Sequence, residues 1–214
     1  MFRNSKISRA LAGKIAKAAK GAVDSYQARL IEQEPQITDR FLGACQHSIN
    51  NTRIGGVHWV AKTFTDRGSN SQEKHFGADF LCSFSLKLPT FTVSKSFLAQ
   101  AKRVEPSDYF SPTTCADMSS QCENMLGISP ASFVFLYSRQ AGVQVVPAIS
   151  VVSARPCNPH ELTSYSVSEF FTDHFECFIG DRSMAISSSA GVEGLLADLH
   201  VRKALALVGH GDEV

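Results

Sequence analysis

The sequence predicts a mixed α/β or α+β domain in which helices cover a central sheet, and three observations indicate this class. The segment "FGADFLCSFSLKL" at 76–88 alternates apolar and polar side chains, which is typical of a strand. "ASFVFLYS" at 131–138 is a short apolar run, which favours a buried strand. Apolar residues between 37 and 49 recur at helical spacing after Glu34-Pro35, and proline is favoured in a first helical turn. Strands and helices together predict a layered domain.

The other elements follow in chain order. Residues 1–23 are predicted to form an amphipathic helix, because Ile7, Leu11 and Ile15 fall at helical spacing. A turn is expected at 50–56, strands at 57–64, 93–104 and 143–152, and helices at 34–49, 114–127, 166–178 and 190–208, with a flexible connector at 183–191. Pro147 cannot donate a ladder hydrogen bond, so part of its strand is expected at an edge or bulge.

Length and composition indicate one domain with appendages. The chain has 214 residues, and we expect a basic helical extension at 1–30, a core at 31–182, and a connector and helix at 183–214. No apolar run approaches the roughly 20 residues that span a bilayer, and the first 22 residues lack the apolar centre of a secretory signal. The six cysteines show no tight framework, so reduced thiols and a cytoplasmic location are expected.

Charge is distributed unevenly, although the formal net charge is only +1. Residues 1–23 contain no acid and six cations, which are Arg3, Lys6, Arg9, Lys14, Lys17 and Lys20. One interpretation is a solvated helix face. A second is a contact with the DNA backbone, for which Lys6, Lys14 and Lys17 are the candidates, since clustered cations supply phosphate affinity. An organelle transit peptide is a third and weaker alternative.

A polar pair interrupts the apolar strand "FLAQAKR" at 97–103. Gln100 and Lys102 point to the same face, about 7 Å apart, and a buried lysine is costly unless it is paired or used. Asp79 lies on the preceding strand, which a short turn joins to this one, so the two strands are expected to be neighbours. Glu34 falls on the inward face of the first core helix. These four side chains are predicted to share one site.

Such a set suits metal-assisted phosphodiester hydrolysis. Mg²⁺, or Mn²⁺ in its place, prefers oxygen ligands. Asp79 is predicted to be the central ligand, with Glu34 and the Gln100 amide oxygen binding directly or through water. A bound metal stabilises charge on the phosphate and lowers the pKa of water. Lys102 is predicted to orient that water or to stabilise the transition state.

The same residues resemble a known family. "GAD" at 77–79 and "QAK" at 100–102, preceded by a helix with a glutamate, resemble the PD-(D/E)XK nuclease superfamily. The likeness is to its Mrr-like branch, in which glutamine replaces the first acid of the last motif. The resemblance implies a restriction-endonuclease-like αβββαβ core with a central mixed sheet flanked by helices, so the core at 31–182 is expected to be nuclease-like. It also implies that Asp79, Gln100, Lys102 and Glu34 are catalytic. Ala78 stands where the superfamily motif has proline.

The resemblance implies a metal-dependent DNA endonuclease of bacterial restriction or antiviral defence, with DNA, defence partner proteins and a second copy of the chain as expected partners. Arg103 and Arg67 are candidate phosphate contacts or ordinary surface cations. One alternative is a catalytically inactive nucleic-acid-binding or interaction module on the same fold. Another is a structural ion pair between Asp79 and Lys102.

Two further kinds of pattern concern a structural zinc site and known catalytic or nucleotide-binding motifs. Cys157 with His160, and His174 with Cys177, have spacings that a structural zinc uses. Zinc is not favoured, because Cys177 suits a buried helical position and His160 follows a proline in a loop. No G-x-S-x-G motif or Walker A loop is present in the sequence.

Overall fold

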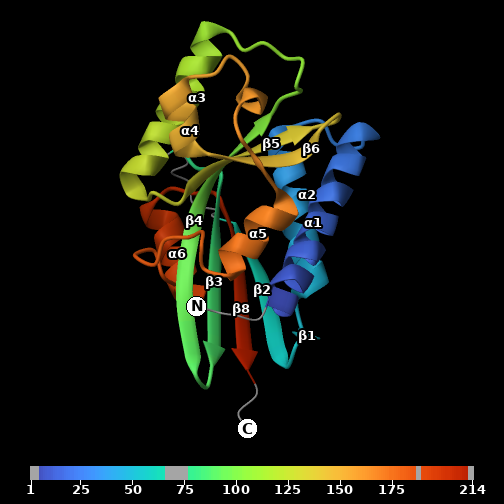
Figure 1. Ribbon diagram of the computed structural model, residues 1–214, viewed down its shortest axis with the longest axis vertical. Helices are drawn as coiled ribbons and strands as arrows, with labels where there is room; N and C mark the ends of the chain where they lie inside the picture. The colour runs from blue at the N-terminus through green and yellow to red at the C-terminus, as the bar shows by residue number, and fades with distance from the viewer. Residues whose placement is uncertain (1–4, 66–76, 187–188, 212–214) are drawn as a thin grey trace.

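The computed structural model describes residues 5–65, 77–186 and 189–211, and these form three layers with a sheet between two groups of helices (Figure 1). The helices are α1 (Ser5–Gln27), α2 (Glu34–Ile49), α3 (Pro112–Ile128), α4 (Ala148–Ala154), α5 (Val167–Phe175) and α6 (Ser189–Asp198). The strands are β1 (Thr52–Ile54), β2 (Val57–Thr65), β3 (Phe80–Leu88), β4 (Phe91–Arg103), β5 (Ser132–Ser138), β6 (Gly142–Pro147), β7 (Tyr165–Ser166) and β8 (Lys203–Gly211). The predicted mixed α/β class is confirmed.

Two separate cores cover the two faces of the sheet. Helices α1, α2 and α5 pack on one face, where Phe80 and Phe84 of β3 meet their apolar side chains. Helices α3, α4 and α6 pack on the other face, which receives Leu81 of β3 and Leu98 of β4. Successive side chains of a strand point to opposite faces, so the central strands supply both cores at once.

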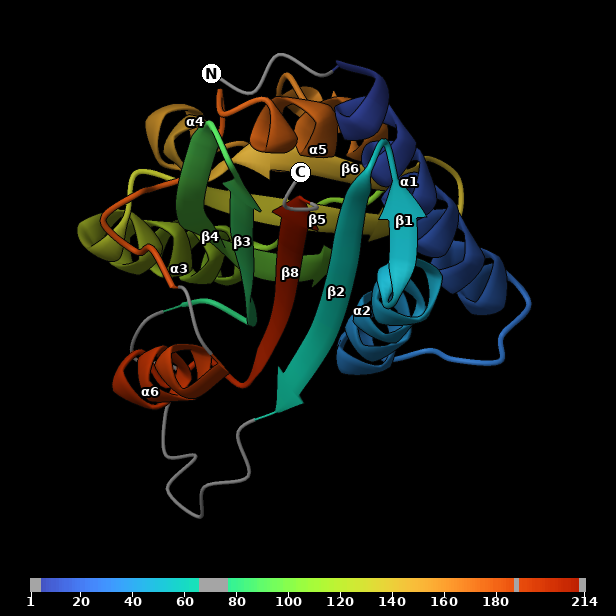
Figure 2. The same cartoon turned by 90° about the horizontal axis from the view of Figure 1, so that it is seen from below.

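The sheet order is β1-β2-β8-β3-β4-β5-β6-β7 among the described residues, and β8 lies between β2 and β3 (Figure 2). It runs antiparallel to β2 and parallel to β3. The helix predicted at 190–208 is therefore wrong in its second half, since α6 ends at Asp198 and His200 has a positive φ of 49°. A strand buried on both faces is a continuous apolar run, and its periodicity does not distinguish it from a buried helix.

Three other boundaries differ from the prediction. Residues 52–54 of the expected turn form β1, which pairs with β2 across Gly55 and Gly56. The strand expected at 143–152 ends at Pro147, and the chain continues as α4 instead. The helix expected at 166–178 ends at Phe175, and Cys177 then adopts a left-handed φ of 70°. Of the expected connector, residues 187–188 lie outside the described residues and 189–191 begin α6.

Helix α1 is part of the packed structure. Its buried face, which includes Ile7, Leu11 and Ile15, joins the same core as α2 and α5. Lys6, Arg9, Lys17 and Lys20 are exposed, whereas Lys14 is half-buried against α2. Of the helix predicted at 1–23, residues 5–23 are confirmed as part of α1, which continues to Gln27, and residues 1–4 lie outside the described residues. The apolar residues at helical spacing face inward as expected.

Lys95, in the middle of β4, is only 1% exposed. Its ammonium donates hydrogen bonds to the carbonyl oxygens of His174 and Ile179, the second at 2.6 Å. Burial lowers the pKa of Lys95 to about 8, because the charged form loses its hydration. The lysine therefore links the last turn of α5 and the segment after it to the central sheet by hydrogen bonds.

Replacing Lys95 with methionine should change how stability depends on pH. The pKa falls from 10.5 in the unfolded chain to about 8 in the folded chain, so the unfolded chain binds more protons between these values. The free energy of unfolding of the wild type, relative to Lys95→Met, should then rise by about 2–3 kcal/mol from pH 8 to pH 10. Urea unfolding across this range measures the difference, with Lys87→Met at an exposed position of β3 as control. A difference that stays constant with pH would contradict the assignment.

Candidate active site

Asp79 lies one residue before β3, and not inside the strand as predicted. Its backbone N–H donates to the carbonyl oxygen of Ala99 at 2.8 Å, so it continues the pairing of β3 with β4. Its carboxylate Oδ2 accepts the backbone N–H of Ala101 at 2.9 Å and the side-chain amide N–H of Gln100. The carboxylate is thus held in one place against β4.

Glu34 is the first residue of α2, where a capping box between Gln33 and Gln36 fixes the first turn. One Glu34 carboxylate oxygen accepts the backbone N–H of Arg103 at 2.9 Å. The start of α2 therefore contacts the end of β4, close to the residues that hold Asp79.

Glu34 and Asp79 line one cavity of about 100 Å³. The other lining residues are Pro35, Thr38, Ala101, Arg202 and Lys203. At its base the Thr38 hydroxyl lies 3.2 Å from the Tyr137 hydroxyl. Burial raises the pKa of Tyr137, and the nearby charges of Asp79 and Glu34 raise it further. The structure thus brings the two predicted acids together.

Gln100 is completely buried and adjoins Asp79, but its amide is turned differently from the prediction. The amide N–H group, rather than the oxygen, faces the Asp79 carboxylate and the Ala101 carbonyl, the latter at 3.1 Å. The amide oxygen is buried and has no hydrogen-bond partner among the described residues. A carboxylate only accepts hydrogen bonds, so the amide presents its N–H donor to Asp79.

Lys102 is partly buried and is not among the residues that line the cavity. It lies near Cys122 of α3, whose pKa is raised to about 12 by burial while the charge of Lys102 acts to lower it. No hydrogen bond or ion pair joins Lys102 to Asp79 in the described structure. The alternative of a structural ion pair between Asp79 and Lys102 is therefore not seen among the described residues.

Arg202 and Lys203 were not predicted as site residues. The Lys203 ammonium donates to the Pro35 carbonyl at 3.0 Å and pairs with Asp39 at 2.6 Å. Arg202 directly precedes β8 and Lys203 is its first residue. This segment was predicted to be helical, so nothing placed the two cations beside Asp79. The signal in the sequence is the Arg-Lys pair directly before the apolar run "ALALV".

The predicted phosphate contacts lie in different places. Arg103 is exposed, and its guanidinium donates to the Glu32 carbonyl beside the cavity. Arg67 lies outside the described residues. Lys14 donates to the Ser48 carbonyl at 2.8 Å, near the end of α2 opposite Glu34 and about 20 Å along that helix. Lys6 and Lys17 are exposed along the same α1 helix.

The possible zinc ligands do not form one set. Both ring nitrogens of His160 are engaged, with Gln144 at 2.9 Å and the Val104 carbonyl at 3.1 Å. His174 instead lies among phenylalanines such as Phe97, in the core that α1, α2 and α5 cover, with Nδ1 at 3.1 Å from the Ile179 carbonyl. Within the described ranges, no three His, Cys, Asp or Glu side chains gather as metal ligands.

The cavity nevertheless has donors of the kind that a hard cation prefers. The Glu34 and Asp79 carboxylates and the Thr38 hydroxyl supply oxygen atoms, and Mg²⁺ is commonly held by only one or two carboxylates with waters and substrate phosphate. The unpartnered amide oxygen of Gln100 is a further oxygen donor nearby. The residues therefore fit Mg²⁺ or Mn²⁺.

In comparisons with known proteins, no family model, curated protein or solved structure matches the chain. None of the described helices is both long and apolar enough to cross a membrane. Interpretation of the cavity therefore depends on its own geometry.

Gly77→Ala should destabilise the protein more than Gly56→Ala. Both glycines have left-handed φ angles, of 75° and 78°, which cost an alanine about 1–2 kcal/mol. A Cβ on Gly77 would also lie 2.3 Å from the Gln121 carbonyl oxygen of α3, whereas one on Gly56 meets no described atom within 4 Å. We expect an additional loss of about 1–3 kcal/mol for Gly77→Ala, measured by urea unfolding. Equal losses would show that α3 does not press on the segment before Asp79.

Proposed function

We propose that the chain is a metal-dependent endonuclease that hydrolyses DNA phosphodiester bonds. The observation that carries this proposal is the single cavity that Glu34 and Asp79 share with Arg202 and Lys203. Two carboxylates suit a divalent cation, and the adjacent cations suit a phosphate group. Opposite charges so close together are the arrangement that phosphoryl chemistry requires.

In this proposal Glu34 and Asp79 hold Mg²⁺ or Mn²⁺, which supplies charge stabilisation at the phosphate and lowers the pKa of the attacking water. The Ala101 N–H and the Gln100 amide keep Asp79 in position, and the Arg103 N–H does the same for Glu34. Arg202 and Lys203 bind phosphate oxygens. Lys203 is itself oriented by Asp39 and the Pro35 carbonyl.

The order of elements supports the implied core. α2, β2, β3, β4, α3 and β5 occur in the αβββαβ order, with the short strand β1 inserted between α2 and β2. β3 and β4 are antiparallel and β4 and β5 are parallel. β8 departs from that simple order, because it separates β2 from β3 and adds Lys203 to the site.

A non-catalytic nucleic-acid-binding or interaction module is the second candidate. It is favoured by the position of Lys102 outside the cavity. This alternative requires salt-sensitive DNA binding without cleavage. A role in bacterial antiviral defence, partner proteins and a homodimer that cuts both strands belong to the proposal for the nuclease.

Cleavage of supercoiled plasmid DNA should require Mg²⁺ or Mn²⁺ and stop in EDTA. Asp79→Asn and Glu34→Gln keep the size and one acceptor oxygen of each side chain and remove the charge, so each should reduce the rate by about 100-fold or more. Asp117→Asn, at an exposed position of α3, is the matched control and should cleave like the wild type. Full activity in Asp79→Asn would contradict the proposed metal site, and DNA binding without any cleavage would favour the binding module.

Lys102→Met and Lys203→Met should separate the two lysines. Lys203 lines the cavity and Lys102 does not, so we expect the larger loss of cleavage, about 10-fold or more, in Lys203→Met. Rates at saturating DNA, measured beside thermal unfolding of both variants, make the comparison. A larger loss in Lys102→Met would instead assign the catalytic role that the resemblance implies and would require Lys102 to turn toward Asp79 when DNA is bound.

A further inference from the structure

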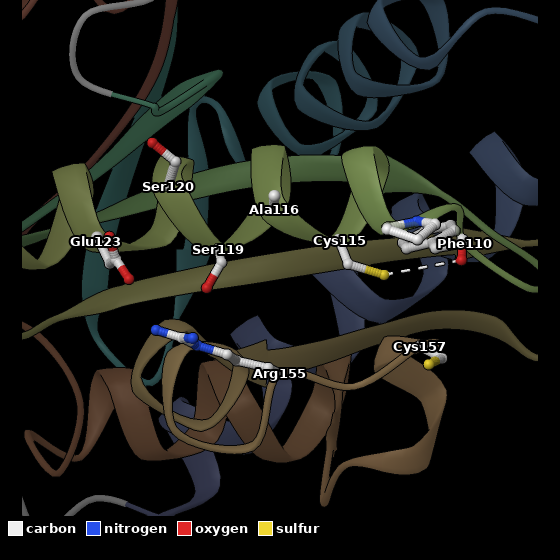
Figure 3. A pocket seen from close by; sticks show the side chains of 9 residues that line it. Phe110, Cys115, Ala116, Ser119, Ser120, Glu123, Arg155 and Cys157 are labelled. Atoms are coloured by element: carbon white, nitrogen blue, oxygen red, sulfur yellow. Dashed lines mark hydrogen bonds between the residues drawn. The ribbon is translucent and has the colours of Figure 1, made fainter.

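A second cavity, of about 510 Å³, lies between α3 and the segment that follows α4 (Figure 3). None of its lining residues also lines the cavity that contains Glu34 and Asp79. Its volume falls within the range of about 300–1,000 Å³ that is typical of small-molecule sites. The walls are mainly apolar, with Phe110, Pro112 and Ala116 among them. The size and lining are those of a ligand site.

Arg155 provides a positive charge at this cavity. It ends α4 in a left-handed conformation with φ 45°, and its backbone N–H donates to the Val151 carbonyl at 2.9 Å. The side chain runs along the cavity beside α3 (Figure 3). Within the described residues, the guanidinium has no hydrogen bond and no ion pair. An arginine that lines a cavity in this way is available to a carboxylate, phosphate or sulfonate.

Ser119 provides an independent observation on the opposite wall. The residue is only 9% exposed, and its hydroxyl oxygen is buried with no hydrogen-bond partner among the described residues. In Figure 3 the Ser119 hydroxyl is directed from α3 toward the side of the cavity where Arg155 lies, and the Arg155 guanidinium ends near Ser119 and Glu123. A buried hydroxyl without a partner costs about 1–3 kcal/mol, which a ligand oxygen between Ser119 and Arg155 would recover.

The charges and walls together define the chemistry of the ligand. Arg155 and Ser119 suit an anionic group, while Phe110 and Ala116 suit an apolar body beside it. Glu123 lines the same cavity and would accept a hydrogen bond from a donor group of the ligand. We propose that this cavity binds a small organic anion with an apolar body, whose anionic group is held by Arg155 and Ser119.

The probe for the test is 8-anilinonaphthalene-1-sulfonate, which combines a sulfonate with an aromatic body and fluoresces in apolar sites. We expect saturable binding of one molecule per chain. Arg155→Gln should weaken binding at least fivefold, and Ala116→Phe, at an exposed position of α3, should abolish it by filling the cavity. Arg40→Gln, which removes an exposed cation of α2, is the matched control and should bind like the wild type.

Inorganic phosphate should fail to displace the probe at equal concentration, because it has the charge without the apolar body. Thermal unfolding midpoints of the variants, expected to match the wild type, show that the fold is kept. Absence of saturable binding, or binding that neither Arg155→Gln nor Ala116→Phe changes, would overturn the proposal. Displacement by phosphate would overturn the part of it that requires an apolar body.

Discussion

The burial of polar side chains within β4 is the constraint on which the rest of the structure depends. Lys95, Ser96 and Gln100 are each at most 1% exposed on this strand, and a buried polar group must find partners. Each of the three recruits a different segment. Lys95 binds carbonyls of the segment after α5, Ser96 binds the Met184 carbonyl, and Gln100 binds Asp79. The long strand thereby fixes the loops around it.

Elements whose sequence pattern is local were predicted, whereas an element whose position depends on distant residues was not. β3 alternates in its sequence, β4 has an apolar stretch around Phe97, and a short turn joins the two strands, so both were predicted closely. β8 was not, because "ALALV" is apolar on every side and suits a helix as well as a doubly buried strand. Its position depends on a pairing between Phe80 and Lys203, far apart in the chain. No local pattern contains that information.

The same distinction separates the site residues that were predicted from those that were missed. Asp79, Gln100 and Glu34 were predicted because a motif and a helix start mark them, and the structure brings these three residues near one another. Lys203 enters the site only through β8 and was missed. The orientation of Gln100 was also beyond the sequence, since an amide offers a donor or an acceptor according to its neighbours. The Asp79 carboxylate sets that choice here.

Residues 119–122 of helix α3 lie beside both the larger cavity and the segment that precedes Asp79. Ser119 faces the larger cavity, Gln121 presses its carbonyl on Gly77, and Cys122 lies near Lys102. Gly77 has no side chain that could absorb a shift, and a packed interior transmits strain because it has little free volume. Helix α3 therefore lies against both the larger cavity and the backbone two residues before Asp79. Because a Cβ at Gly77 would meet the Gln121 backbone, the approach of the chain to Asp79 depends on glycine at this position.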